Sequence, residues 1–267
     1  MNLQPVKHHE PVTILMVPYD QYSSFPKAVD NLFKATTHPF KLIVVEGNAP
    51  EDVRHELEKR KKKHRNIQII YSAHTPRMAE AFNLGLVHIR TRHAFLMHNQ
   101  LLVRPGWLSG LIEHVKTRTG VLYPHVRGAD GGPFALLHAL LATRELLDEI
   151  GLFDESVGTP LLGIDLENRL KTKGVPVHRD PATVLEYQAP EALKKGPDRT
   201  FFQHQWDDPH AHRTLAYLKQ KWGSAPEQSR YLEWLAKKRS VRHRPVFVLP
   251  LTNANGLKKF MQALRLA

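Results

Sequence analysis

The chain has 267 residues, 42% of them hydrophobic and 24% charged, and this balance indicates a folded globular protein rather than a disordered chain. It has no cysteine, which excludes disulfide scaffolds, cysteine-ligated zinc and thiol nucleophiles. Lysine and arginine outnumber aspartate and glutamate by 38 to 26, and the net charge of +12 favours anionic partners. No apolar run approaches the ~18–20 residues that span a bilayer, and the first residues lack the apolar core of a signal peptide, so we expect a soluble cytoplasmic protein.

The first hundred residues alternate between short apolar runs and segments with helical signals. Apolar residues three and four positions apart, or a helix-start signal at Asn48 and Pro50, predict helices at 25–35, 51–64 and 78–89. Strand–helix alternation builds right-handed βαβ units, with a ligand crevice at the carboxyl ends of the strands. The apolar runs are rich in β-branched residues and too short for buried helices, so they predict strands of a parallel sheet at 12–17, 42–46, 67–71 and 94–97.

The second half of the chain continues the alternation and then changes composition. Thr143 is expected to cap a helix that ends at Ile150, with Gly151 just beyond it. From residue 189 onward the composition is polar, tryptophan-rich and basic, which predicts a helical extension at 191–267 packed on the same domain. The other predicted elements are a helix at 107–116, a strand at 121–126, a glycine-rich loop at 127–133, a strand at 134–142, a helix at 163–173 and an extended segment at 175–178.

Five stretches carry a resemblance to a known family. VTILMVPYDQY resembles its opening strand and loop, LIVVEGNAPED its second strand with an acidic end, and EAFNLGL its Ala-x-Asn-x-Gly helix. FLMHNQLLVRPGWLSGL resembles the strand that carries the metal motif, and RELLDEIGLFDES followed by GIDLENRLKTKGVPV resembles the acceptor-side segment. Their order and spacing over residues 11–188 resemble glycosyltransferase family 2.

The resemblance implies the GT-A fold, a Rossmann-like and mostly parallel central sheet flanked by helices, here followed by the basic C-terminal extension. The domain at 1–190 would divide into a nucleotide-binding half at 11–105 and an acceptor half at 106–190. The implied enzyme transfers a sugar, with inversion, from a nucleotide-diphospho-sugar to a hydroxyl of a glycan, a lipid-linked glycan or a specialised metabolite, as in polysaccharide biosynthesis. The alternative is a catalytically inactive GT-A domain that acts as a binding or scaffold module.

The family pattern assigns donor binding to several loops. Glu46 takes the place of an acidic residue that hydrogen-bonds the base, although a helix-capping or solvated glutamate is the alternative. Tyr19 is in a position to stack on the base. The full set of expected donor-binding residues is Pro18, Tyr19, Asp20, Glu46, Arg77, Asn83, His98, Asn99 and Gln100.

The sequence departs from the family at the metal motif. Gln100 stands where a metal-ligating aspartate is usual, and a neutral amide is a poor ligand for Mg²⁺ or Mn²⁺. Tyr187 or Gln188 stands where the family often has a second metal-holding histidine. We therefore expect no metal and no other cofactor. Arg77 replaces a glycine that faces the diphosphate, and three alternatives stay open: it neutralises phosphate, it fills the donor pocket, or it is an exposed loop arginine.

The catalytic base is expected at Asp165, with Glu167 as a second candidate. The family usually carries a Glu-Asp pair just upstream, where this chain has Leu162 and Gly163. An ordinary ion pair between Asp165 and the arginine four residues later is the alternative. Two further residues, Trp107 and Asp154, are assigned to the acceptor side, the latter as part of a turn.

The basic run at 59–65 has two interpretations. It is either the solvated end of a helix, where cations suit the helix dipole, or a contact for an anionic membrane surface or polymer. Nucleic acid is not expected, because no binding motif accompanies the charge. The sequence also lacks the Gly-x-Ser-x-Gly, Walker and Gly-x-Gly-x-x-Gly patterns, which argues against hydrolases, P-loop enzymes and standard dinucleotide binders.

Overall fold

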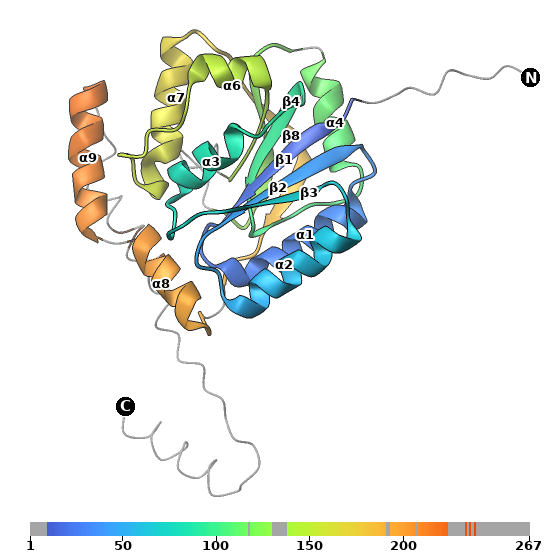
Figure 1. The fold of residues 1–267 in the computed structure, drawn as a ribbon. Helices are drawn as coiled ribbons and strands as arrows, with labels where there is room; N and C mark the ends of the chain where they lie inside the picture. Colours follow the sequence, from blue (N-terminus) through green and yellow to red (C-terminus); the bar gives the residue numbers. More distant parts are fainter. Residues whose placement is uncertain are drawn as a thin grey trace, which may run out of the picture.

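The four apolar runs near the start of the chain form the parallel half of one mixed sheet in the computed structural model (Figure 1). The strands β2 and β4 flank β1 in parallel pairing, and β3 lies beyond β2. All six residues of β1 are buried, as expected for an interior strand that is covered on both faces. These strands are β1 (Val12–Val17), β2 (Phe40–Glu46), β3 (Ile67–Tyr71) and β4 (His93–His98). The model describes residues 10–116, 118–129, 138–190, 193–206 and 208–223, together with Glu233, Leu235 and Lys238.

The second half of the sheet brings a distant strand end beside β4. The strand β7 pairs antiparallel with β4, β6 pairs antiparallel with β7, β8 runs parallel to β6, and the short β5 closes the edge, giving the order β3-β2-β1-β4-β7-β6-β8-β5. Two reversals restore the original direction, so β1, β4 and β8 all end at the same edge of the sheet. These strands are β5 (Leu101–Leu102), β6 (Val121–Arg127), β7 (Ala139–Thr143) and β8 (Val177–Tyr187).

Helices cover both faces of the sheet, and each face has its own hydrophobic cluster. In Figure 1, α1 and α2 lie together on one face, and α3, α6 and α7 lie on the other. The first face is covered by α1 (Phe25–Ala35), α2 (Glu51–Lys63) and α4 (Trp107–Val115), with a 3-10 turn, η1 (Tyr22–Ser24), before α1. The second face is covered by α3 (Met78–Leu86), α6 (Arg144–Ile150) and α7 (Leu162–Thr172), with a 3-10 turn, η2 (Thr159–Leu161), before α7.

Two later helices follow, α8 (Gly196–Gln205) and α9 (Asp208–Trp222). Of these, α8 contacts both clusters, Phe201 in that of the first face and Phe202 in that of the second. Trp206, just after α8, and Leu218 of α9 are buried in the same cluster as α3 and α7, and Leu235 joins them. Burial of these apolar side chains holds the start of the predicted extension on the domain.

The contact between α3 and β1 depends on a glycine. A Cβ atom on Gly85 would lie 2.1 Å from Leu15 Cδ1, so a larger residue would require either the Leu15 side chain or the helix to shift. This close approach sets the position of α3 over the carboxyl half of the sheet.

The mixed α/β fold is confirmed, and several local predictions need correction. The strand predicted at 134–142 is β7, which begins at Ala139, while residues 134–137 lie outside the described residues. Thr143 caps α6 as predicted, accepting from the Leu146 N–H at 3.2 Å, and Gly151 follows with φ +84°. Asn48 is not a helix cap: it adopts a left-handed φ of +63° in the turn before α2.

Two other boundaries differ. The helix predicted at 78–89 ends at Leu86, and most of the predicted extension beyond residue 223 lies outside the described residues. Across the described helices, none combines the length and apolar character needed to cross a bilayer.

Candidate functional site

Loops far apart in the sequence meet where β1, β4 and β8 end. The Asp20 backbone N–H donates to Gln100 Oε1 at 2.7 Å, and Gln100 Nε2 donates back to Asp20 Oδ2 at 3.1 Å. The Tyr187 hydroxyl, at the end of β8, donates to the same carboxylate oxygen at 2.5 Å. Two residues predicted for the donor site, Asp20 and Gln100, are therefore joined through a carboxylate that is fully buried.

Asn99 holds the loop that follows β1. Its Oδ1 accepts from the Tyr19 N–H at 3.2 Å, and its Nδ2 donates to the Gln21 carbonyl at 2.6 Å. The preceding Pro18 is buried. The amides of the 98–100 turn are thus used to fix the first loop.

Lys238 brings a positive charge into this edge of the sheet from the distant C-terminal part of the chain. Its Nζ lies 2.7 Å from Asp20 Oδ2 and 2.6 Å from the Tyr187 hydroxyl, and 12% of the side chain is exposed. The ammonium offsets the charge of the buried carboxylate. The other oxygen, Asp20 Oδ1, has no hydrogen-bond partner among the described residues.

The ring of Tyr19 is covered on all the sides that a nucleotide base would use. It stacks on His98, with ring centroids 4.2 Å apart and planes at 14°, and Trp206 meets it edge-on at 5.2 Å. The Lys238 ammonium lies 4.7 Å from its centroid, within cation–π range. Only 3% of Tyr19 is exposed, so in this conformation the chain itself occupies the stacking position predicted from the sequence.

His98 and His138 form a buried imidazole pair beneath Tyr19. His98 Nδ1 accepts from the Gln100 N–H at 3.2 Å, which assigns the ring hydrogen to Nε2, and Nε2 donates to His138 Nδ1 at 2.9 Å. Burial, followed by the charges of His138 and Lys238, lowers the pKa of His98 well below its usual 6.5. His98 is therefore neutral at physiological pH.

Glu46 ends β2 as a fully buried carboxylate that already has partners. Arg54 Nε lies 2.8 Å from Oε1, and the Ala49 N–H donates to Oε2 at 3.1 Å at the start of α2. Ala49 precedes the N-cap of α2, and that helix has no side-chain cap, so Glu46 is neither the helix-capping nor the solvated glutamate considered from the sequence. Its predicted role in binding a base stays a prediction.

Arg77 lies beside the end of β2. A Cβ atom on Gly47 would come within 2.1 Å of the His74 carbonyl oxygen, so only a glycine allows this loop to approach β2 so closely. The loop leads to Arg77, which is half-buried at the N-cap of α3. The fold thus brings the loop that leads to Arg77 close to the end of β2, where Glu46 lies.

Asn83 joins α3 to the loop after α6. Its Oδ1 accepts from the Phe153 N–H at 2.7 Å, and its Nδ2 donates to the Phe153 carbonyl at 2.9 Å and to Glu155 Oε1 at 2.8 Å. All of these contacts are structural, and none involves the residues at the ends of β1, β4 and β8.

Asp165 lies in an ion-pair network between α7 and α9. It is fully buried, with Arg169 Nε at 3.0 Å, Lys221 Nζ at 2.8 Å and the indole N–H of Trp222 at 2.9 Å. The ion pair with Arg169 considered from the sequence is present. Glu167, on the same helix, is exposed.

The two predicted acceptor-side residues lie in different places. Asp154 accepts from Lys221 Nζ at 2.6 Å and from the Tyr217 hydroxyl at 2.7 Å, which ties it to the Asp165 network. Trp107 lies in the cluster on the opposite face, where its indole N–H donates to Thr36 Oγ1 at 2.9 Å. The structure does not bring them together.

The basic run at the end of α2 is partly compensated within the molecule. Lys59 pairs with Glu56 at 2.8 Å, and Arg60 pairs with Glu56 at 2.7 Å and with Asp30. Lys61 pairs with Glu58 at 3.3 Å. These contacts agree with a solvated helix end, and membrane contact stays a prediction.

A sequence model of the family "Glycosyl transferase family 2" matches residues 13–166, which is more than half of the chain. The chain belongs to this family. No curated protein matches the family 2 chain in a sequence search.

Solved structures similar to this family 2 chain agree on the GT-A fold. A mannosyltransferase from Pyrobaculum calidifontis, in complex with GDP-mannose and Mn²⁺, has a TM-score of 0.60 at 15% identity and covers 88% of this chain and 86% of its own. GalNAc-T7 with UDP, GalNAc and Mn²⁺ has a TM-score of 0.59 at 11% identity, covering 89% of this chain and 55% of its own. S. aureus TarS 1–349 has a TM-score of 0.56 at 11% identity, covering 84% and 77%.

The expectation that no metal is needed is contradicted by these comparisons, because two of the similar structures hold Mn²⁺ with a nucleotide or nucleotide sugar. The described residues of this chain, however, contain no group of three or more histidine, aspartate or glutamate side chains arranged to hold a metal ion. At the edge of the sheet, Asp20 Oδ1 is an orphaned carboxylate oxygen that suits a cation, but Asn99 and Gln100 direct their amide oxygens to backbone N–H groups. A single carboxylate oxygen supplies too few ligands to hold Mn²⁺. We therefore derive no step through a metal.

Sequence reasoning missed three side chains that shape this family 2 site, namely His138, Trp206 and Lys238. His138 interrupts the apolar run at 134–142, and such an interruption is a usable signal for a buried polar pair. Trp206 and Lys238 come from the extension, where composition indicates helices but not which residue reaches the sheet edge.

Proposed function

We propose that this chain transfers a sugar, with inversion, from a nucleotide-diphospho-sugar to a hydroxyl of a glycan, a lipid-linked glycan or a specialised metabolite. Membership of family 2 supports nucleotide-sugar glycosyl transfer in general. The observation that carries the proposal is the convergence of the Tyr19–Asp20 loop, Glu46 and the 98–100 turn at the carboxyl ends of β1, β2 and β4. In open α/β sheets, ligands bind at this edge, where the strand order reverses.

The donor roles follow from this placement. Tyr19 offers a ring for the base once Trp206 and Lys238 move aside, and Glu46 offers a carboxylate to its polar edge. Arg77, at the start of α3, offers a guanidinium that suits the oxygens of a diphosphate. Charge stabilisation of the departing nucleoside diphosphate is the main catalytic demand on such a site.

The proton of the acceptor hydroxyl needs a carboxylate, and the two candidates differ in availability. Asp165 must release Lys221 and Trp222 before it can accept a proton. Glu167 is exposed but lies on a helix surface. We keep Asp165 as the proposed base and Glu167 as the second candidate.

A binding or scaffold module is the second candidate function. Two observations favour it: the chain covers the Tyr19 ring, and three donors hold Asp165. In this alternative the GT-A domain binds a nucleotide or glycan without turnover.

Calorimetric titration of the full chain separates these functions. The ligands are a panel of nucleoside diphosphates and nucleotide sugars, each with Mn²⁺ and again with EDTA, followed by release of nucleoside diphosphate in an acceptor screen. We expect binding of one nucleotide class with Mn²⁺, weakened about tenfold by Glu46→Gln, because a charged hydrogen bond to the base is lost. Glu56→Gln, on the exposed side of α2, is the control. Binding without turnover supports the module, and no binding by the unaltered chain contradicts both functions.

A further inference from the structure

Exposed cations gather near the amino ends of β2 and β3, at the opposite end of these strands from the proposed donor site. The carboxyl ends of α1 and α2 meet there: the two helices lie together on one face of the sheet (Figure 1), and the rings of Phe33 and His64 stack with centroids 3.7 Å apart. Asn66, between α2 and β3, donates from Nδ2 to the Phe40 carbonyl at 2.9 Å. The cations, which together form the amino-edge surface, are Lys34, Lys41, Lys62, Lys63 and Arg65.

The carboxylates near this surface are used by other cations. Asp30 of α1 pairs with Arg60. Glu58 pairs with Lys61 at 3.3 Å. None of the five cations of the amino-edge surface has an ion pair with another described residue of the chain. Glu10, just before β1, is an exposed carboxylate at the same edge of the sheet, and the five positive charges outnumber it.

The helix dipole explains only part of this surface. A cation in the last turn of a helix is favourable because the carboxyl end carries a partial negative charge, and this accounts for Lys34, Lys62 and Lys63. Lys41 lies on β2, where no helix end explains it, and Arg65 follows the C-cap of α2. Separate elements therefore present uncompensated cations on one side of the molecule, which helix stability alone does not require.

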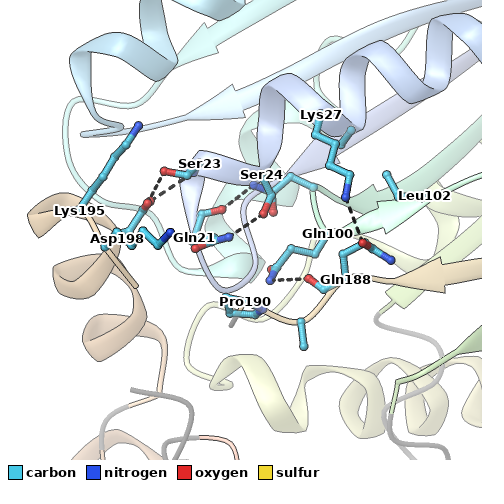
Figure 2. Close-up of a pocket in the computed structure, with 14 residues that line it drawn as sticks. Gln21, Ser23, Ser24, Lys27, Gln100, Leu102, Gln188, Pro190, Lys195 and Asp198 are labelled. Atoms are coloured by element: carbon cyan, nitrogen blue, oxygen red, sulfur yellow. Dashed lines mark hydrogen bonds between the residues drawn. The ribbon is translucent and has the colours of Figure 1, made fainter. Parts of the chain in front are cut away.

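The amino-edge surface offers distributed charge rather than an enclosed site. Its cations line neither the cavity beside η1 (Figure 2) nor the smaller cavity between α3 and α6. Phe33 stacks on His64 and also packs against the core, so its ring is not a free platform for a nucleobase. Four of the five cations are lysines, which act as point charges without the two-point geometry of arginine. These features suit an extended anionic surface.

We propose that the amino-edge surface binds the anionic surface of a lipid bilayer. The negative potential of such a bilayer attracts nearby lysines, and each one strengthens binding about fivefold. Salt screens this attraction within about 8 Å, so only cations on one side of the molecule act together. At about 3.3 Å per residue, strands of six or seven residues place the carboxyl edge of the sheet about 20 Å from the bilayer. The contact therefore leaves the proposed donor site uncovered and stands independently of the proposed transfer.

Co-sedimentation of the full chain with vesicles tests this contact. One set of vesicles contains phosphatidylcholine alone, and the other contains phosphatidylcholine and phosphatidylglycerol in equal parts. We expect the chain to bind the second set and not the first, and to be released as salt is raised. Lys62→Gln/Lys63→Gln is expected to weaken binding about 25-fold, since two cations are lost. The control Arg213→Gln/Lys219→Gln removes the same charge from exposed positions on α9 and is expected to leave binding unchanged.

A second pair of substitutions separates the surface from the end of α2. Lys34→Gln/Lys41→Gln removes two cations from α1 and β2 and leaves α2 unaltered. We expect the same loss of about 25-fold, because the bilayer responds to charge and not to a particular helix.

Single cysteines report which side of the molecule contacts the bilayer, because the chain has no cysteine of its own. Thr37→Cys places a label in the exposed loop after α1, at the amino edge of the sheet. Ala73→Cys places one in the exposed loop after β3, at the carboxyl edge. With a dye that is sensitive to its environment, we expect a response to anionic vesicles from Thr37→Cys and none from Ala73→Cys.

Several outcomes overturn the proposal. Equal binding to both sets of vesicles, binding to neither, or an equal loss in Lys62→Gln/Lys63→Gln and the α9 control means that this surface is not a membrane contact. A response from Ala73→Cys alone means that the opposite edge faces the bilayer. A single-stranded oligonucleotide that binds more tightly than the anionic vesicles, and weakens in the same variants, assigns the surface to nucleic acid instead. Nucleotide titration of Lys62→Gln/Lys63→Gln is expected to match the unaltered chain, so failure here is distinguishable from failure of the proposed transfer.

Discussion

The carboxylates Asp20 and Asp165 are both fully buried, yet their surroundings differ. Asp165 has cations against both oxygens and an indole N–H, all supplied by two helices that it joins. Asp20 has its cation and hydroxyl on one oxygen, while the other oxygen has no hydrogen-bond partner among the described residues. The first arrangement is a buried ion-pair network that links α7 to α9. The second leaves capacity for a ligand at the edge of the sheet.

The largest expected loss of stability follows from disrupting the Asp165 ion-pair network. Asp165→Asn leaves Arg169 and Lys221 without their shared charge, and breaking a buried ion pair from one side costs about 3 kcal/mol or more. Urea unfolding measures this loss as a lower midpoint. Glu167→Gln, an exposed position on the same helix, is expected to change the free energy of unfolding by less than about 0.5 kcal/mol. Similar small changes in both variants would show that the network contributes little.

A smaller effect is expected at the edge of the sheet. Lys238→Gln removes the ammonium from Asp20 and from three aromatic rings, and losing a charged hydrogen bond costs about 2 kcal/mol. Thermal and urea unfolding of the full chain report the change, with Lys219→Gln, exposed on α9, as the control. If both variants unfold like the unaltered chain, the Lys238 contact does not stabilise the fold.

The smallest expected effect on the free energy of unfolding comes from His98 and appears only at acidic pH. Because the folded pKa of His98 is lowered, the unfolded chain takes up a proton below about pH 6.5 that the folded chain resists. Stability is therefore lost as pH falls from about 6.5 toward the folded pKa, by about 1.4 kcal/mol per pH unit from this group. His98→Asn is expected to flatten the measured dependence, whereas His55→Gln, exposed on α2, is expected to leave it. A slope that His98→Asn does not change would contradict this explanation.

The local pattern of the sequence predicts the first half of the sheet well, because strands β1 to β4 are encoded by short apolar runs and their helices by spacing. Spacing also predicts the Asp165–Arg169 pair, four residues apart on one helix turn. It does not predict that Lys221, 56 positions away, reaches the same carboxylate. Nor does it predict Lys238 beside Asp20, since helical and strand periods describe neighbours along an element and not which distant side chain fills a gap. Trp107 shows the same limit, because its placement depends on which face of the sheet α4 covers.

The covered ring of Tyr19 has a consequence for how any nucleotide would be measured to bind. A ligand that stacks on this ring can bind only molecules in which Trp206 and Lys238 have moved away, so its apparent affinity is its true affinity multiplied by the fraction of open molecules. If about one molecule in a hundred is open, the apparent affinity falls by about a hundredfold, although every contact in the bound state is intact. Substitutions that loosen this cover would then tighten nucleotide binding while they weaken the folded chain.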